Sequence, residues 1–107
     1  MEQSELQRKF HSGQDILRAV EKHGPILRRM GVRKIGLFGS YQAGNFTTES
    51  DIDFLIVLDN PSFDGYMSVK LFLEDLFGCR IDLVREQALK PRIRPRILED
   101  VRYASGP

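Results

Sequence analysis

The sequence of 107 residues has few of the side chains that form disulfides or bind soft metals. It contains one cysteine, Cys79, and two histidines, His11 and His23. A single cysteine excludes an internal disulfide, and neither histidine has a second His or a Cys three or four residues away, which argues against a zinc site. We expect Cys79 to be a small buried thiol at the start of a strand and not a nucleophile.

Long apolar runs and an excess of one charge are also absent. No apolar stretch approaches the roughly 20 residues of a membrane-spanning helix, and no secretory signal precedes Leu6. The 16 Lys and Arg nearly balance the 15 Asp and Glu, for a formal net charge of +1, so direct binding to nucleic acid is not expected. We expect one soluble cytoplasmic domain over residues 1–107, too small to include a separate acceptor-binding domain.

Two apolar segments joined by a polar connection dominate the middle of the chain. The first is Val32–Phe38, which ends at the turn Gly39-Ser40, and the second is Phe54–Leu58, which follows Asp51 and Asp53. Both segments are typical of β-strands because they are apolar, alternating or β-branched, and bounded by turn residues. Asp51 and Asp53 are two residues apart, so their side chains leave the same face of the strand.

Two carboxylates on one face predict a cation between them. Like charges held close together repel and raise each other's pKa unless a cation or a shared proton compensates. Mg²⁺ is the usual cation, since it binds through a few carboxylates plus substrate phosphates. Gly39 allows backbone N–H groups to approach a phosphate, and the hydroxyl of Ser40 adds a donor. The pattern therefore favours a nucleotide site.

A third carboxylate, Asp82, lies within the apolar segment Arg80–Val84, where an unpaired charge would be costly if it were buried. A helix predicted between the second and third strands makes them parallel neighbours with a right-handed crossover. That connection brings Asp82 level with Asp51 and Asp53. We therefore expect three carboxylates to converge at one edge of the sheet.

The remaining segments predict helices that cover one face of the sheet. An amphipathic helix is expected over Gln14–Lys22, a short one before Gly31, and a longer one over residues 66–77. The apolar stripe of the first includes Leu6, Phe10, Ile16, Leu17 and Val20. Together these segments predict an α/β fold: a small mixed sheet of about three strands, with helices packed on one face and the acidic site on the open edge.

The C-terminal segment has a local run of positive charge, formed by Lys90, Arg92, Arg94 and Arg96. Pro91 and Pro95 limit how continuous a helix can be here, so we expect helix mainly from Pro95 onward. The basic run is either a solvated face or a contact for a triphosphate or an acidic partner.

The Gly39-Ser40 turn, followed at this spacing by Ser50-Asp51-Ile52-Asp53, resembles the signature of the polymerase-β-like nucleotidyltransferase superfamily. The chain is most similar to the minimal nucleotidyltransferases, over Val32 to about Tyr103. The resemblance implies that Asp51 and Asp53 bridge two Mg²⁺ ions and that Asp82 is the third ligand and helps to deprotonate the acceptor hydroxyl. It also implies that Gly39 and Ser40 hold the triphosphate of ATP while pyrophosphate leaves.

The resemblance also implies a partner. Such proteins are often encoded beside a HEPN-type toxin and act as its antitoxin, in some cases by adding AMP to a tyrosine of that partner. One departure is Ala43, because many members have Arg at this position. Two alternatives stay open: a non-catalytic antitoxin that neutralises its partner by occlusion, and nucleotidyl transfer to a small molecule such as an aminoglycoside. The second is disfavoured because no further domain exists to build a pocket for the acceptor.

Overall fold

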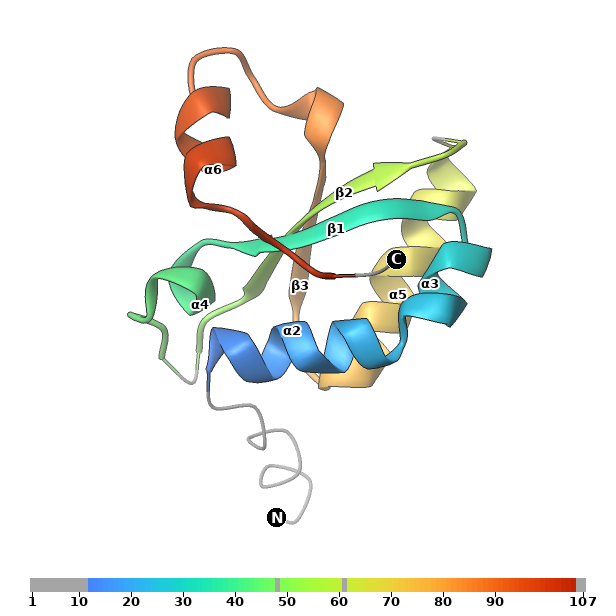
Figure 1. Ribbon diagram of the computed structural model, residues 1–107, viewed down its shortest axis with the longest axis horizontal. Coiled ribbons are helices and arrows are strands. Elements are labelled where there is room, and N and C mark those ends of the chain that lie inside the picture. Colours follow the sequence, from blue (N-terminus) through green and yellow to red (C-terminus); the bar gives the residue numbers. More distant parts are fainter. Residues whose placement is uncertain (1–11, 48, 61, 106–107) are drawn as a thin grey trace.

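The computed structural model describes residues 12–47, 49–60 and 62–105, and its elements appear in Figure 1. The strands are β1 (Val32–Phe38), β2 (Ile52–Leu58), β3 (Ile81–Arg85) and β4 (Arg102–Tyr103). The helices are α2 (Gly13–Lys22), α3 (Gly24–Arg29), α4 (Ser40–Ala43), α5 (Phe63–Phe77), the 3-10 turn η1 (Glu86–Ala88) and α6 (Arg94–Asp100). The expected helices and strands are confirmed, although Leu6, Phe10 and His11 lie outside the described residues.

The four strands form one mixed sheet in the order β3-β2-β1-β4. β1 is antiparallel to β2 and to β4, whereas β2 and β3 are parallel. The parallel pair is the one predicted from the crossover helix, which is α5. The short strand β4 is an addition to the three strands expected from the sequence.

The hydrophobic core lies between the sheet and the layer of α2, α3 and α5. Alternate residues of β2 enter it, because successive side chains of a strand point to opposite faces. The core comprises Ile16, Leu17, Val20, Leu27, Val32, Ile35, Leu37, Ile52, Phe54, Ile56, Leu58, Val69, Leu73, Phe77, Ile81 and Leu83. Cys79 is partly buried against it. Asp53 and Leu55, between these positions in β2, therefore face the other side.

The helices begin and end at residues suited to those positions. Ser12 precedes α2, and its Oγ accepts a hydrogen bond from the amide of Asp15 at 3.1 Å. Ser62 does the same for α5, accepting from the amide of Gly65 at 3.0 Å. Gly78 ends α5 in a left-handed conformation with φ of 67°, which glycine adopts without strain. None of the helices in the described part of the chain is long and apolar enough to span a bilayer.

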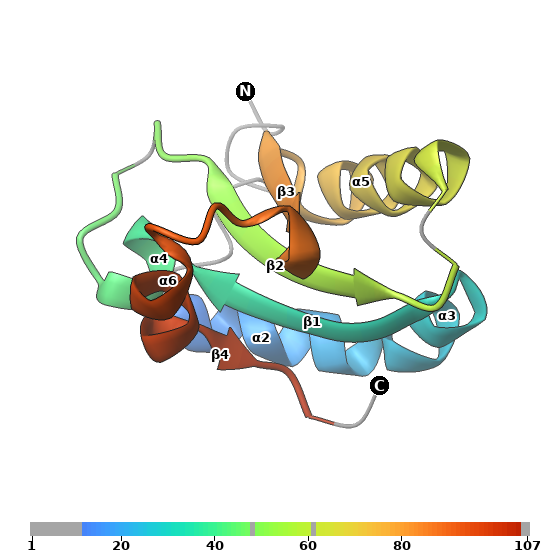
Figure 2. The ribbon, with the colours of Figure 1, turned by 90° about the horizontal axis from the view of Figure 1, so that it is seen from above.

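The segment from η1 to α6 lies on the face of the sheet opposite α2, as Figure 2 shows with the chain between η1 and α6 passing in front of β2 and with α2 behind β1. Leu55 and Leu89 are buried outside the main core. Glu86 holds this segment in place: its carbonyl accepts from Arg94 at 2.9 Å and its carboxylate accepts from the Tyr103 hydroxyl at 2.5 Å. Burial and the bond to Glu86 raise the pKa of Tyr103 to about 12.

Candidate active site

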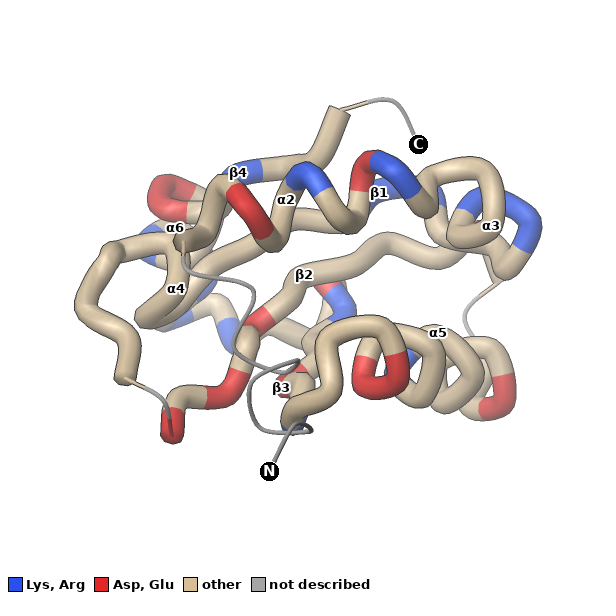
Figure 3. Tube along the Cα trace, turned by 90° about the horizontal axis from the view of Figure 1, so that it is seen from below, with Lys and Arg blue, Asp and Glu red and all other residues tan. Residues whose placement is uncertain are grey.

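The acidic residues meet where β1 ends and β2 and β3 begin. Asp53 of β2 is the register partner of Asp82 in β3 and of Phe38 in β1, and Asp51 directly precedes β2. Strand alternation turns all three carboxylates to the face that α2 and α5 leave open. Figure 3 shows acidic positions at the start of β2 and on β3 at this end of the sheet.

Asp53 is at the electrostatic centre of this edge. Its pKa is raised from 3.8 to about 6, first by burial, then by the charge of Asp82 and a hydrogen bond between the two side chains, and last by the charge of Asp51. A hydrogen bond between two carboxyl groups requires a proton on one of them. Without a cation, Asp53 therefore keeps its proton to a higher pH than an isolated aspartate does.

The other two carboxylates differ from Asp53 in their surroundings. Asp82 is exposed on the edge strand β3, so the argument that its burial would make an unpaired charge costly does not apply. Asp51 is partly turned toward Arg80, with its Oδ1 4.0 Å from the Nε of that residue, and both side chains are well exposed. An exposed pair at this distance contributes little to stability.

The carboxylates suit a hard divalent cation. Within the described residues, no group of three or more His, Cys, Asp or Glu side chains is close enough to hold an ion. The structure thus brings Asp53 and Asp82 together, with Asp51 near enough to influence Asp53 electrostatically. Mg²⁺ needs only one or two carboxylates when water and substrate phosphates supply the other oxygens. The donor set at this edge fits that requirement.

The raised pKa of Asp53 leads to a prediction for the metal-free protein. The pKa of Asp53 is higher in the folded state than in the unfolded state, so its ionisation destabilises the fold. The free energy of unfolding therefore falls as the pH rises from about 4 to about 6. Asp53→Asn removes the charge and should raise the melting temperature at pH 7.5 in EDTA, but not at pH 4. Solvent screening limits the gain to about 1 kcal/mol, or roughly 4–8 °C.

Thermal unfolding of both proteins across this pH range measures the effect. Asp59→Asn is the matched control, since Asp59 lies at the other end of β2, is well exposed and is only 3.7 Å from Arg33. If the wild type instead became more stable than Asp53→Asn as the pH rises, ionised Asp53 would not be destabilising.

The turn after β1 places backbone next to the carboxylates. Gly39 has φ 79° and ψ −154°, a region that only glycine occupies readily. A Cβ atom at Gly39 would collide with Oδ2 of Asp53. The turn and the acidic edge are therefore in direct contact, and no larger residue fits between them.

A cleft of about 450 Å³ continues from this turn along α4. Its lining residues are Gly39, Ser40, Gln42, Ala43, Asn45 and Asp100. The rings of Tyr41 and Phe46 stack with centroids 4.2 Å apart, which fixes α4 against the loop that follows it. In the part of the chain that the structure describes, the lining offers backbone, hydroxyl and carboxamide groups and one carboxylate, but no Lys or Arg. Gln42, Asn45 and Asp100 were not identified from the sequence.

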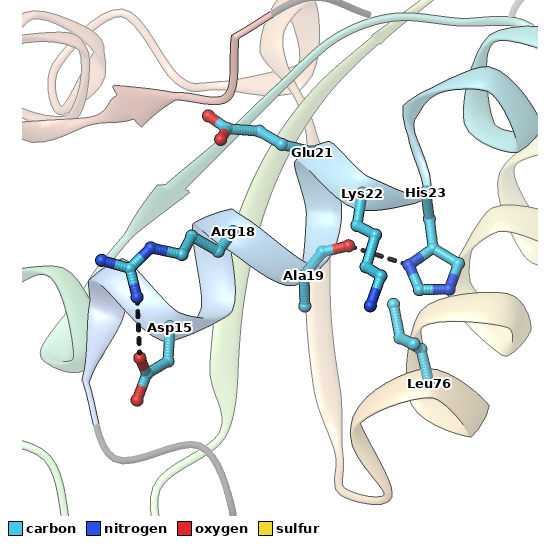
Figure 4. Close-up of a pocket in the computed structure, with 7 residues that line it drawn as sticks. All are labelled: Asp15, Arg18, Ala19, Glu21, Lys22, His23 and Leu76. Carbon is cyan, nitrogen blue, oxygen red and sulfur yellow. Dashed lines mark hydrogen bonds and ion pairs between the residues drawn. The ribbon is translucent and has the colours of Figure 1, made fainter.

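A larger hollow of about 740 Å³ lies between α2 and α5, away from the acidic edge (Figure 4). Several of its polar groups have partners within the protein: Arg18 lies 3.7 Å from Asp15, and Nδ1 of His23 is 2.8 Å from the carbonyl of Ala19. The carboxylate of Glu21 accepts from the amide of Ser105 at 2.8 Å. The ring of His23 also meets Phe72 edge-on. These contacts give Arg18, Asp15 and His23 structural roles. We therefore consider the acidic edge, and not this hollow, as the candidate active site.

Comparison with known proteins identifies a family. The family model of the nucleotidyltransferase domain matches residues 16–104, a range that contains the acidic edge and the cleft. The protein adenylyltransferase MntA of Thermococcus cleftensis is 38% identical over 91 residues, which cover 84% of this chain and 90% of the relative.

Solved structures show the same fold. One described as a candidate minimal nucleotidyltransferase matches with a TM-score of 0.75 and 27% identity, covering 88% of this chain and 97% of the other. A chain from the structure of the tri-AMPylated Shewanella oneidensis HEPN toxin in complex with MNT antitoxin matches with a TM-score of 0.60 and 18% identity. That match covers 85% of this chain and 73% of the other.

Proposed function

The chain belongs to the nucleotidyltransferase domain family, and from this premise we propose that it transfers AMP from ATP to a tyrosine of a HEPN-type toxin and thereby acts as its antitoxin. The observation that carries the proposal is the pairing of Asp53 with Asp82 beside the Gly39 turn. Carboxylates that share an edge with a close-approach glycine are arranged to hold a metal-bound phosphate.

In this proposal Asp51, Asp53 and Asp82 would hold two Mg²⁺ ions. When bound, the ions would neutralise charge on the triphosphate and on the attacking oxygen. Gly39 allows the phosphates to approach the backbone closely, and the hydroxyl of Ser40 donates a hydrogen bond to a phosphate oxygen. The acceptor oxygen attacks the α-phosphorus, its proton passes toward Asp82, and the bond to the leaving pyrophosphate breaks.

The choice of a protein acceptor rests on two relatives. The Thermococcus cleftensis relative is named a protein adenylyltransferase, and the Shewanella oneidensis complex contains an AMPylated HEPN toxin. In this proposal another chain therefore presents the acceptor hydroxyl. Lys90, Arg92 and Arg96 are exposed and would attract an acidic surface of that chain, whereas Arg94 is bound to Glu86.

Intact-mass analysis of the partner tests the proposal. The HEPN-type protein encoded beside this chain is incubated with it, ATP and Mg²⁺, and Asp53→Asn serves as the inactive control. We expect AMP to be added to the partner by the wild type only, and peptide mapping should place it on tyrosine. Tight binding and neutralisation without added mass would instead favour an antitoxin that acts by occlusion.

A further inference from the structure

Among the described residues, the lining of the cleft beside Ser40 includes one carboxylate, Asp100, and no Lys or Arg. The triphosphate that the proposed function requires therefore has no cation among these lining residues. Resting on that proposed function, we propose that α6 forms a wall of the triphosphate site, with Arg96 as the cation that contacts the β- and γ-phosphates. Asp100 is the opposing charge on the same wall, and it limits affinity for the nucleotide.

The pairing of β4 with β1 sets the position of α6. Leu37 is opposite Arg102 and Gly36 is opposite Tyr103. Continuing this antiparallel register by two residues places Asp100 level with Gly39, which explains why the C-terminal end of α6 reaches the cleft. Gly36 makes the approach possible, since a Cβ atom there would lie 2.6 Å from Cγ2 of Val101.

The rotation of α6 about its axis is also set. Arg94 points toward η1, because its guanidinium donates to the carbonyl of Glu86 at 2.9 Å. At 3.6 residues per turn, Arg96 lies about 160° around the helix from Arg94 and only about 40° from Asp100. Since Asp100 lines the cleft, Arg96 is on the cleft side of α6, one turn before it.

The side chain of Arg96 is available for a ligand. It is exposed, and within the described residues it takes part in no ion pair or hydrogen bond. A guanidinium group binds phosphate oxygens through two parallel N–H groups, which makes arginine better suited than lysine to this contact. A cation from α6 would thus supply the positive charge that is missing at position 43, where this chain has Ala43.

Binding of Mg²⁺ and AMP-PNP by calorimetry, without the toxin partner, tests the inference. Arg96→Ala should weaken binding by about tenfold, the scale of one charge-assisted hydrogen bond. Asp100→Asn should tighten it by about two- to fivefold, as expected when one exposed like charge is removed. Neither variant should change the affinity for AMP, which lacks the β- and γ-phosphates. Arg96→Lys should recover part of the loss.

The controls remove equivalent charges elsewhere. Arg33→Ala removes an exposed arginine at the far end of β1, and Glu99→Gln removes the carboxylate next to Asp100 on α6. Both should bind AMP-PNP like the wild type. Unchanged affinity in Arg96→Ala, or weaker binding in Asp100→Asn, would overturn the inference while leaving the proposed function intact. A wild type that does not bind AMP-PNP would refute the nucleotide site itself and this inference with it.

Discussion

Asp53→Asn is expected to reduce nucleotidyl transfer by roughly 10³-fold or more, without unfolding the protein. Asp53 is the register partner of Asp82, the charge of Asp51 helps to raise its pKa, and its carboxylate lies against the turn at Gly39. Asn keeps the size of the side chain and can donate to Asp82, but it removes the negative charge that a divalent cation needs. The measurement is kcat/KM for AMP transfer to the partner at saturating Mg²⁺.

Asp59→Asn is the matched control for this experiment, since it changes an exposed carboxylate just after the other end of β2. It should leave kcat/KM within about twofold of the wild type, as surface substitutions usually do. If Asp53→Asn retained full turnover, the acidic edge would not be the catalytic centre.

The other two carboxylates should differ in the size of their effects. If Asp51 and Asp53 hold the ions as proposed, Asp51→Asn should be as severe as Asp53→Asn, whereas Asp82→Asn should leave traces of activity because its proposed share in the site is smaller. Asp51 lies near Arg80, with both side chains well exposed. A mild effect of Asp51→Asn would contradict its proposed role as a metal ligand.

Much of the fold could be predicted because it rests on local patterns and connection rules. The strand Val32–Phe38 follows from apolar alternation, and the second strand follows from the continuous apolar run Phe54–Leu58. A helix between two parallel strands requires a crossover. That crossover makes β2 and β3 parallel and brings Asp82 beside Asp53. The pairing at the centre of the site therefore follows from sequence order and the chirality of the connection.

The C-terminal segment could not be predicted in the same way, because distant residues determine its path. The Tyr103 hydroxyl bonds to Glu86, 17 residues earlier, and β4 has only two residues, too few for a periodic pattern. The placement of Asp100 in the cleft depends on that pairing. Among the described residues there is also no close cluster of three carboxylates, and sequence spacing does not determine side-chain positions such as that of Asp51 near Arg80.

Gly39→Ala is expected to remove at least about 99% of the activity, because it affects the turn and the acidic edge together. The backbone at φ 79° and ψ −154° is strained for alanine, which costs about 1–3 kcal/mol. The new Cβ atom would also displace the carboxylate of Asp53. Stability should fall by about 2 kcal/mol, seen as a melting temperature lower by roughly 8–16 °C.

Gly31→Ala separates backbone strain from damage to the site. Gly31 also has a positive φ, 95°, but nothing lies within 4 Å of the position of its Cβ atom, and it precedes the far end of β1. It should lose about 1 kcal/mol of stability and keep the wild-type kcat per folded molecule, measured below the melting temperature of both variants. Comparable losses of kcat in the two variants would mean that strain alone inactivates the protein. An active Gly39→Ala protein would show that the turn after β1 does not contact the nucleotide.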